Sequence, residues 1–265
     1  MTNDHRTTHR AMIIDAHCHL GVSPQFFLPD ASVGTMLRVM DRLGIERAIA
    51  APMASLSGQA EWGWREGLQA YGESGGRILL YAVFDPLAPA SLDFVRRSLG
   101  EPAAVGIKIH PSLAQCPADD DRWRPVWELA ADRRVPILSH SWSISDYNPV
   151  QKYSQPALFA RYVREFPKVS LILGHSGGRY EGHVAAAALA RQHANVFLDL
   201  AGDCYSLGLV EYLVAQAGAD RILFGSDLTW IDPRTQLGMV LDAELSDFDK
   251  VCILRENALR LFCLR

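Results

Sequence analysis

The sequence predicts an α/β protein, a single-domain (β/α)8 TIM barrel, and three observations carry this prediction. Short apolar runs rich in β-branched residues recur along the chain, as expected for buried parallel strands. Amphipathic segments separate these runs, whose ends are spaced at a mean of about 30 residues, enough for one strand and one helix. No linker or break in composition divides the chain, so we expect a polar tail over 1–10 and one barrel domain over 11–265.

Each expected strand ends at or near a recognisable residue, and helical patterns lie between them. In order, the strand ends are His17, Pro52, Phe84, His110, His140, His175, Asp199 and Asp227. The helical segments are 33–44, 89–100, 124–134, 155–166, 182–193 and 207–218, with 248–262 as a last helix that closes the barrel. Several of them stop at glycine or just before proline, as helices do. An open doubly wound sheet would need a glycine-rich phosphate loop after the first strand, and HCHLGVSP is not one.

Composition excludes several classes of protein. A formal charge of −4 argues against a general binder of nucleic acid or anionic membranes. The chain has no apolar run long enough to span a bilayer, and its polar start, MTNDHRTTHR, lacks the apolar core of a signal peptide. Its five cysteines are odd in number and scattered without CxxC spacing, which argues against a disulfide framework. We therefore expect a cytoplasmic protein that acts on a small molecule, with no nucleic-acid or membrane partner.

Polar side chains at the strand ends predict a metal site. His17 and His19 are two residues apart on a strand, so both can face one ion. His140 and Asp227 end two other strands, and the C-terminal ends of barrel strands meet at one mouth. Three imidazoles and one carboxylate suit a single divalent ion, zinc before manganese, with a position left for water. The structural alternatives are a core histidine at His140 and a helix N-cap at Asp227.

Further candidates for catalysis lie on the remaining strands. We expect His175, which precedes SGGR, to be catalytic together with Asp227 and to act as a general acid/base; a further metal ligand is its alternative. His110 and Lys108 share one face of their strand, and we expect His110 to contact the substrate. A buried Lys108 would require a partner, or could carry a carbamate that bridges two ions.

The loops after the strands should line the substrate pocket. They are 21–30, 53–64, 141–148, 178–183, 202–206 and 228–233. Trp142 and Trp230 closely follow proposed ligands, so we expect them to form aromatic walls. Arg179 lies four residues after His175 and is expected to bind a substrate carboxylate through two N–H donors, with a surface ion pair as its alternative.

The ordered motifs IIDAHCHLG, GIKIHP, PILSH, LILGHSGG and LFGSD, with ILRENALRLF near the end, resemble the amidohydrolase-related (amidohydrolase 2) metal-dependent hydrolases. The resemblance is to the branch that contains aminocarboxymuconate semialdehyde decarboxylase, and it covers nearly the whole chain. It implies a barrel in which His17, His19, His140 and Asp227 bind one divalent ion and His175 is the catalytic histidine. Dimers are common among such relatives, so the resemblance also implies a possible homodimer.

These observations favour a metal-dependent hydrolase of a small-molecule amide, ester or lactone, which uses a metal-activated water at the barrel mouth. The alternative on the same site is a non-oxidative decarboxylase of a small unsaturated or aromatic carboxylic acid. A TatD-like deoxyribonuclease is less favoured because the chain reads GIKIHP where that family has a metal-bridging glutamate, and because it lacks a basic surface. A barrel that has lost catalysis and only binds a ligand is a further alternative.

Overall fold

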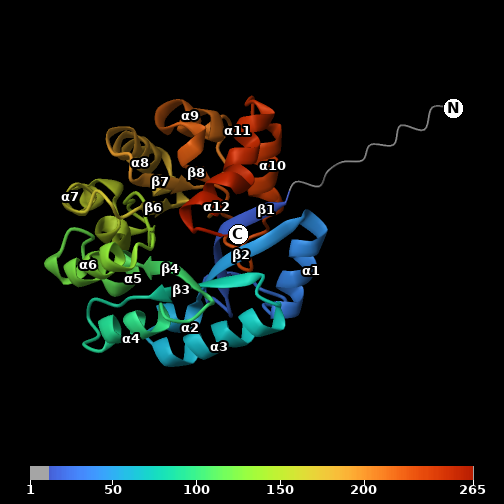
Figure 1. Ribbon diagram of the computed structural model, residues 1–265. Coiled ribbons are helices and arrows are strands. Elements are labelled where there is room, and N and C mark those ends of the chain that lie inside the picture. The colour runs from blue at the N-terminus through green and yellow to red at the C-terminus, as the bar shows by residue number, and fades with distance from the viewer. Residues whose placement is uncertain (1–11, 265) are drawn as a thin grey trace.

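The computed structural model describes residues 12–264 and confirms the (β/α)8 barrel (Figure 1). Eight parallel strands follow one another around the barrel in chain order: β1 Ile13–Leu20, β2 Ile45–Pro52, β3 Ile78–Val83, β4 Ala104–Ile109, β5 Ile137–His140, β6 Leu171–Gly174, β7 Val196–Asp199 and β8 Ile222–Leu223. Backbone hydrogen bonds from Ala16 N to Phe224 O (2.9 Å) and from Asp227 N to His17 O (2.9 Å) join β1 to the segment after β8. The last strand is thereby brought back to the first.

Helices surround the strands, and most of them match the predicted segments. They are α1 Val33–Leu43, α2 Met53–Leu56, α3 Ala60–Glu73, α4 Ser91–Ser98, α5 Pro111–Ala114, α6 Arg124–Arg133, α7 Ala160–Glu165, α8 Tyr180–Gln192, α9 Leu209–Ala217, α10 Arg234–Asp242, α11 Asp247–Val251 and α12 Asn257–Leu261. A π-helical turn, Cys252–Glu256, joins α11 to α12. In the described part of the chain, no helix is long and apolar enough to cross a membrane.

The prediction of a pocket loop over 53–64 is wrong, because α2 and the first five residues of α3 lie in this range. Three glycines in α3 lower its helix propensity and conceal the helical pattern. Two of them are needed for packing: a Cβ on Gly63 would lie 2.4 Å from Ser55 N, and one on Gly67 would lie 2.8 Å from Leu80 Cδ1. Trp64 accordingly packs edge-on against Phe94 at a centroid distance of 6.2 Å, away from any substrate pocket.

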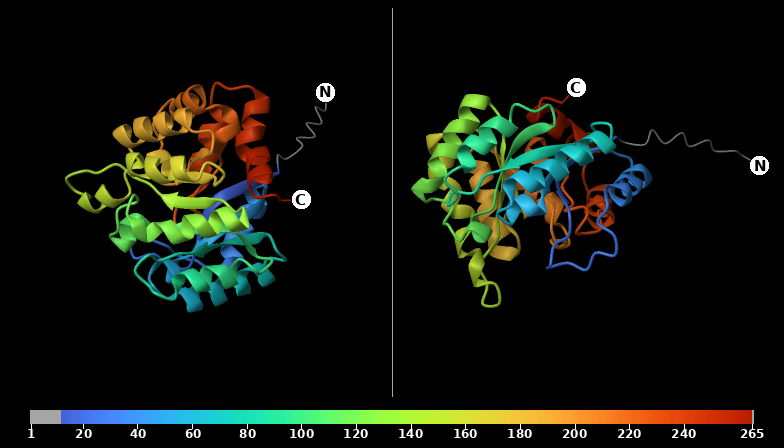
Figure 2. Two further views of the ribbon diagram at one scale, coloured as in Figure 1. Left: turned by 60° about the vertical axis from the view of Figure 1, so that its left-hand side comes forward. Right: turned by 90° about the horizontal axis from the view of Figure 1, so that it is seen from below.

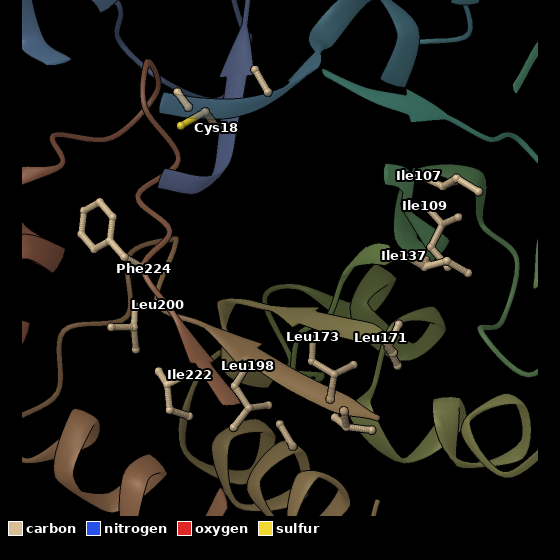
Figure 3. Packing of buried hydrophobic residues seen from close by; sticks show 14 of the residues in the cluster. Cys18, Ile107, Ile109, Ile137, Leu171, Leu173, Leu198, Leu200, Ile222 and Phe224 are labelled. Atoms are coloured by element: carbon tan, nitrogen blue, oxygen red, sulfur yellow. The ribbon is translucent and has the colours of Figure 1, made fainter. Parts of the chain in front are cut away.

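Alternate residues of the strands divide the core into two layers. Ile14, Leu138, Ile172, Phe197 and Leu223 belong to the layer inside the barrel, which Ala258 and Phe262 extend at one end. The opposite faces of the strands pack against the helices, and Figure 3 shows part of this outer layer, including Cys18 and Leu173. The outward position of Cys18 follows from strand alternation and separates its thiol from the two flanking histidines.

The two ends of the barrel differ. In the right-hand view of Figure 2, the loops near residues 21–30 and 141–150 project from the end opposite the C-terminus. These loops follow β1 and β5, so they mark the C-terminal ends of the strands, where barrel enzymes carry their sites.

Candidate metal centre and active site

The first two candidate ligands project from β1, where a register shift between Asp15 and Cys18 interrupts the regular pairing with β2. His17 is fully buried and His19 nearly so. The carbonyl of Ala51 lies 3.3 Å from His19 Nδ1 and can only accept a hydrogen bond, so the proton of His19 is on Nδ1. Burial lowers the pKa of both histidines well below the usual value. Both are therefore neutral imidazoles, the form that binds metal.

Close packing with β6 sets the position of the His17 ring. A Cβ on Gly174 would lie 3.0 Å from His17 Cε1, closer than side-chain contacts ordinarily come. The glycine before His175 in LILGH therefore makes room for the imidazole of His17 across the barrel.

Asp227 faces this histidine pair from the segment after β8. Its Oδ1 lies 3.4 Å from His17 Nε2 and 3.2 Å from His19 Nε2. The residue has a φ of 59°, a left-handed conformation that costs a non-glycine residue roughly 1–3 kcal/mol. Buried Asp15 holds the segment in place by accepting hydrogen bonds from Ser226 N (3.1 Å) and Ser226 Oγ (2.5 Å). Burial raises the pKa of Asp15 to about 7, although Ser226 opposes the shift.

Asp199, at the end of β7, lies behind His17 and was given no functional role by the sequence analysis. Its Oδ2 is 2.9 Å from His17 Nδ1, and its Oδ1 accepts hydrogen bonds from His175 N (2.8 Å) and Ala201 N (3.0 Å). Burial raises the pKa of Asp199. Metal-binding histidines usually have a carboxylate or carbonyl on the nitrogen remote from the ion, and Asp199 takes that position at His17. The sequence signal that could have identified Asp199 is its position at the end of an apolar run, VFLD.

His175 and His140 form a pair beside Asp227. His175 Nδ1 lies 3.6 Å from Asp227 Oδ2, and His175 Nε2 lies 3.0 Å from His140 Nδ1. The second ring nitrogen of His140, Nε2, is 3.0 Å from Gln151 Oε1. Burial lowers the pKa of both histidines to about 3, and the charge of Lys108 adds to the shift at His140. These histidines are also neutral in the folded protein.

The structure thus brings the predicted residues into one cluster, but not with equal proximity. His17, His175 and Asp227 each offer a donor atom within 4.8 Å of the others. His19 lies next to this group, with its Nε2 3.2 Å from Asp227 Oδ1. His140 contacts the group at His175, with its Nδ1 3.0 Å from His175 Nε2.

Lys108 and His110 also belong to the site. Lys108 Nζ lies 2.8 Å from His17 Nε2, and an ammonium can only donate, so His17 Nε2 presents a lone pair and Nδ1 carries the proton. Burial lowers the pKa of Lys108 to about 8, against the opposing effect of the Asp227 and Asp199 carboxylates. His110 accepts a hydrogen bond from Leu113 N (3.2 Å) and stacks on His140 at 4.1 Å, which makes it part of the wall.

A cavity of about 220 Å³ opens over the cluster, and two stacks of parallel rings line it. In one, the His19 ring lies on Trp230 at 3.6 Å with an interplanar angle of 1°. In the other, His140 is parallel to Trp142 within 2°, at 6.1 Å. Arg179, half exposed at the rim, forms an ion pair with Asp203 (3.1 Å) and lies over the ring of Trp142 at 5.9 Å. All four predicted substrate contacts (His110, Trp142, Arg179 and Trp230) therefore line the cavity.

The donor set fits a divalent metal ion. Two buried atoms of the cluster, Asp227 Oδ1 and His175 Nδ1, have no hydrogen-bond partner, which is a costly state for buried polar groups. Imidazole nitrogens and a carboxylate are ligands that zinc and manganese accept. The fold and this cluster define the class: a (β/α)8 barrel with a candidate metal site at the C-terminal ends of its strands.

The chain belongs to the amidohydrolase family, whose model matches residues 14–264. No protein with curated annotation matches the chain. Among solved structures, it resembles the 5-carboxyvanillate decarboxylase of Sphingomonas paucimobilis, with a TM-score of 0.75, 15% identity, and 96% of this chain and 100% of that chain covered. It also resembles the 2,6-dihydroxybenzoate decarboxylase of Rhizobium, with a TM-score of 0.74, 19% identity and coverage of 95% and 98%.

A third similar structure is the 5-carboxyvanillate decarboxylase of Novosphingobium aromaticivorans, which was solved with manganese and 4-hydroxy-3-methoxy-5-nitrobenzoic acid. It has a TM-score of 0.75, 13% identity and 97% coverage of each chain. At these identities the likeness establishes the shared fold.

Proposed function

We propose that this protein is a metal-dependent, non-oxidative decarboxylase of a small planar carboxylic acid, aromatic or unsaturated. The observation that carries the proposal is the pair of parallel ring stacks beside the imidazole and carboxylate cluster. Flat aromatic walls suit a planar substrate. The decarboxylases of similar fold, one solved with manganese and a nitrobenzoic acid, support the same chemistry.

In this proposal His17, His19, His140 and Asp227 hold the ion, in agreement with the ligand set that the family resemblance implies. A bound divalent ion would supply positive charge to hold the substrate's carboxylate and to polarise a neighbouring oxygen. The unpartnered Asp227 Oδ1 supports this assignment, because the ion would satisfy it. The lone pair of His17 Nε2, which already faces the ammonium of Lys108, supports it too.

The chain's own groups would orient the acid and move one proton. Trp142 and Trp230 would stack against the ring, and Arg179 would bind an acidic substituent once it leaves Asp203. His175 would take up a proton from solvent beside the negatively charged substrate and transfer it to the carbon that bears the carboxylate. The carbon–carboxylate bond would then break, CO₂ would leave, and the bonding electrons would return to the ring. The net change replaces a carboxylate by a hydrogen on the same carbon.

Hydrolysis of an amide, ester or lactone, the first expectation from the sequence, is now the second candidate. Asp227 favours it specifically, since a buried carboxylate beside three imidazoles can accept a proton from an attacking water. The two reactions use the same residues and differ in which bond breaks.

The test is to load the purified chain with manganese or zinc and to supply hydroxybenzoic acids in deuterated water. Decarboxylation predicts release of CO₂ with one deuterium at the ring carbon that carried the carboxylate. Amides, esters and lactones in water labelled with oxygen-18 test hydrolysis in parallel, by incorporation of the label into the product acid. Asp227→Asn should abolish turnover, whereas the exposed helix variant Asp93→Asn should not. Labelled hydrolysis products without CO₂ release would refute the decarboxylase proposal.

A further inference from the structure

A buried glutamine, Gln151, lies behind His140 on the 3-10 turn Pro149–Tyr153. Three polar atoms meet at its Oε1: Ser112 Oγ at 2.9 Å, Ser154 Oγ at 2.8 Å and His140 Nε2 at 3.0 Å. Both serines are buried. Nothing in the sequence motifs points to these three residues, which lie outside the ligand set described above.

We propose that Gln151 is a positioning residue that fixes the tautomer of His140, so that Nδ1 faces the metal centre as a free lone pair. This inference rests on the proposed metal site. Gln151 lines the cavity beside His140, and the role that we assign to it is exerted through His140.

The structure places the carboxamide oxygen of Gln151 at this meeting point. The oxygen carries no hydrogen, so it can only accept. Ser112 Oγ and Ser154 Oγ, themselves 2.7 Å apart, can donate to each other as well as to the oxygen. His140 Nε2 at 3.0 Å has to donate, because a bare ring nitrogen would face the oxygen lone pair to lone pair, and the hydrogen of His140 is therefore on Nε2.

The tautomer of His140 in turn determines whether His175 Nε2 donates or accepts a hydrogen bond. With its hydrogen on Nε2, His140 offers a lone pair at Nδ1, and His175 Nε2 donates to it across 3.0 Å. Metal binding at His140 Nδ1 would take over this lone pair and release the N–H of His175 toward the cavity. The opposite tautomer would put a hydrogen on His140 Nδ1, which could not bind metal and would turn His175 Nε2 into an acceptor. Gln151 thereby selects both the ligand nitrogen and the direction in which His175 can donate.

The experiment is imidazole nitrogen NMR of the full-length, metal-free chain with ¹⁵N-labelled histidine, because protonated and bare ring nitrogens have well-separated shifts. The wild type should show His140 with its hydrogen on Nε2. Gln151→Met, which keeps the length but removes the acceptor, should populate the Nδ1–H form, and Gln151→Glu should restore Nε2–H. The dissociation constant for Zn²⁺ should rise about 10- to 100-fold in Gln151→Met and recover in Gln151→Glu. Gln155→Met, on the same segment, is the matched control.

A hydrogen on His140 Nδ1 in the wild type would overturn the proposal, and this measurement alone decides it if Gln151→Met does not fold. An unchanged tautomer and zinc affinity in a folded Gln151→Met protein would overturn it equally. Failure of the proposed function is distinguishable: a chain that neither binds metal nor decarboxylates any acid would still show the tautomer change if Gln151 acts as argued.

Discussion

Removing the charge of the Asp199 carboxylate tests how the metal centre is built. We predict that Asp199→Asn weakens metal binding about 10- to 100-fold. Asp199 Oδ1 accepts two backbone N–H groups, from His175 and Ala201. These donors would hold the oxygen of an asparagine at the same place, so its NH₂ would face His17 Nδ1. Two donors cannot share a hydrogen bond, and His17 would have to move its hydrogen to Nε2.

That tautomer removes one of the proposed ligands, since Nε2 is the nitrogen that faces Asp227. The loss of affinity corresponds to about 1.4–2.8 kcal/mol, because each 1.4 kcal/mol is a factor of ten. The assay is calorimetric titration of the metal-free variant with Zn²⁺, with the nitrogen shifts of His17 as a second measurement. Asp93→Asn, on the exposed face of α4, is the control. A dissociation constant equal to that of the wild type, or a hydrogen retained on His17 Nδ1, would refute the reasoning.

Three further predictions test the neighbouring parts of the site. Gly202→Ala should lower kcat at least about tenfold, because a Cβ there would lie 2.7 Å from His175 Nδ1. Gly208→Ala is the control: Gly208 also has a positive φ but open space around it, so kcat should hardly change. Equal losses of kcat in the two variants would contradict the argument. Arg179→Ala should raise KM for an acidic substrate far more than for a neutral one, and a similar rise for both would remove Arg179 from substrate binding. His140 has a pKa of about 3 when folded and an ordinary value when unfolded, so below pH about 6.5 the unfolded chain binds more protons and stability falls as the pH falls. In guanidinium titrations, the free energy of unfolding of His140→Gln should therefore depend less steeply on pH, by up to about 1.4 kcal/mol per unit between pH 6.5 and 3; parallel dependences would contradict it.

The fold was predictable because each strand is an apolar run that ends at a polar or turn-forming residue, a signal confined to a few neighbouring residues. Among the helices that the sequence did not predict, which include α2, α5 and α10, one is instructive. Helix α3 was missed because Gly63 and Gly67 serve close contacts with Ser55 and Leu80, which lie in other elements. Local propensity therefore opposed a helix that tertiary packing requires.

The candidate ligands could be predicted for the same reason, since the ends of parallel barrel strands converge. The contacts that these ligands make with other buried groups could not be predicted. Asp199 reaches His17 across 182 positions of sequence, and Lys108 reaches the same ring across 91. Such contacts depend on which side chains meet inside the closed barrel, and a single sequence carries no local pattern for them.

The supporting groups also suggest how the proposed ligands differ from one another. His17 donates to a carboxylate, His19 to the carbonyl of Ala51, and His140, in our proposal, to the carboxamide of Gln151. A charged acceptor makes a stronger hydrogen bond than a neutral one and raises the basicity of the opposite nitrogen. His17 should therefore be the strongest metal ligand of the three. It is also the histidine whose Nε2 faces the ammonium of Lys108 in the metal-free chain. The strongest ligand thus lies beside the ammonium of Lys108, 2.8 Å from its Nε2, so metal binding at His17 requires Lys108 to move.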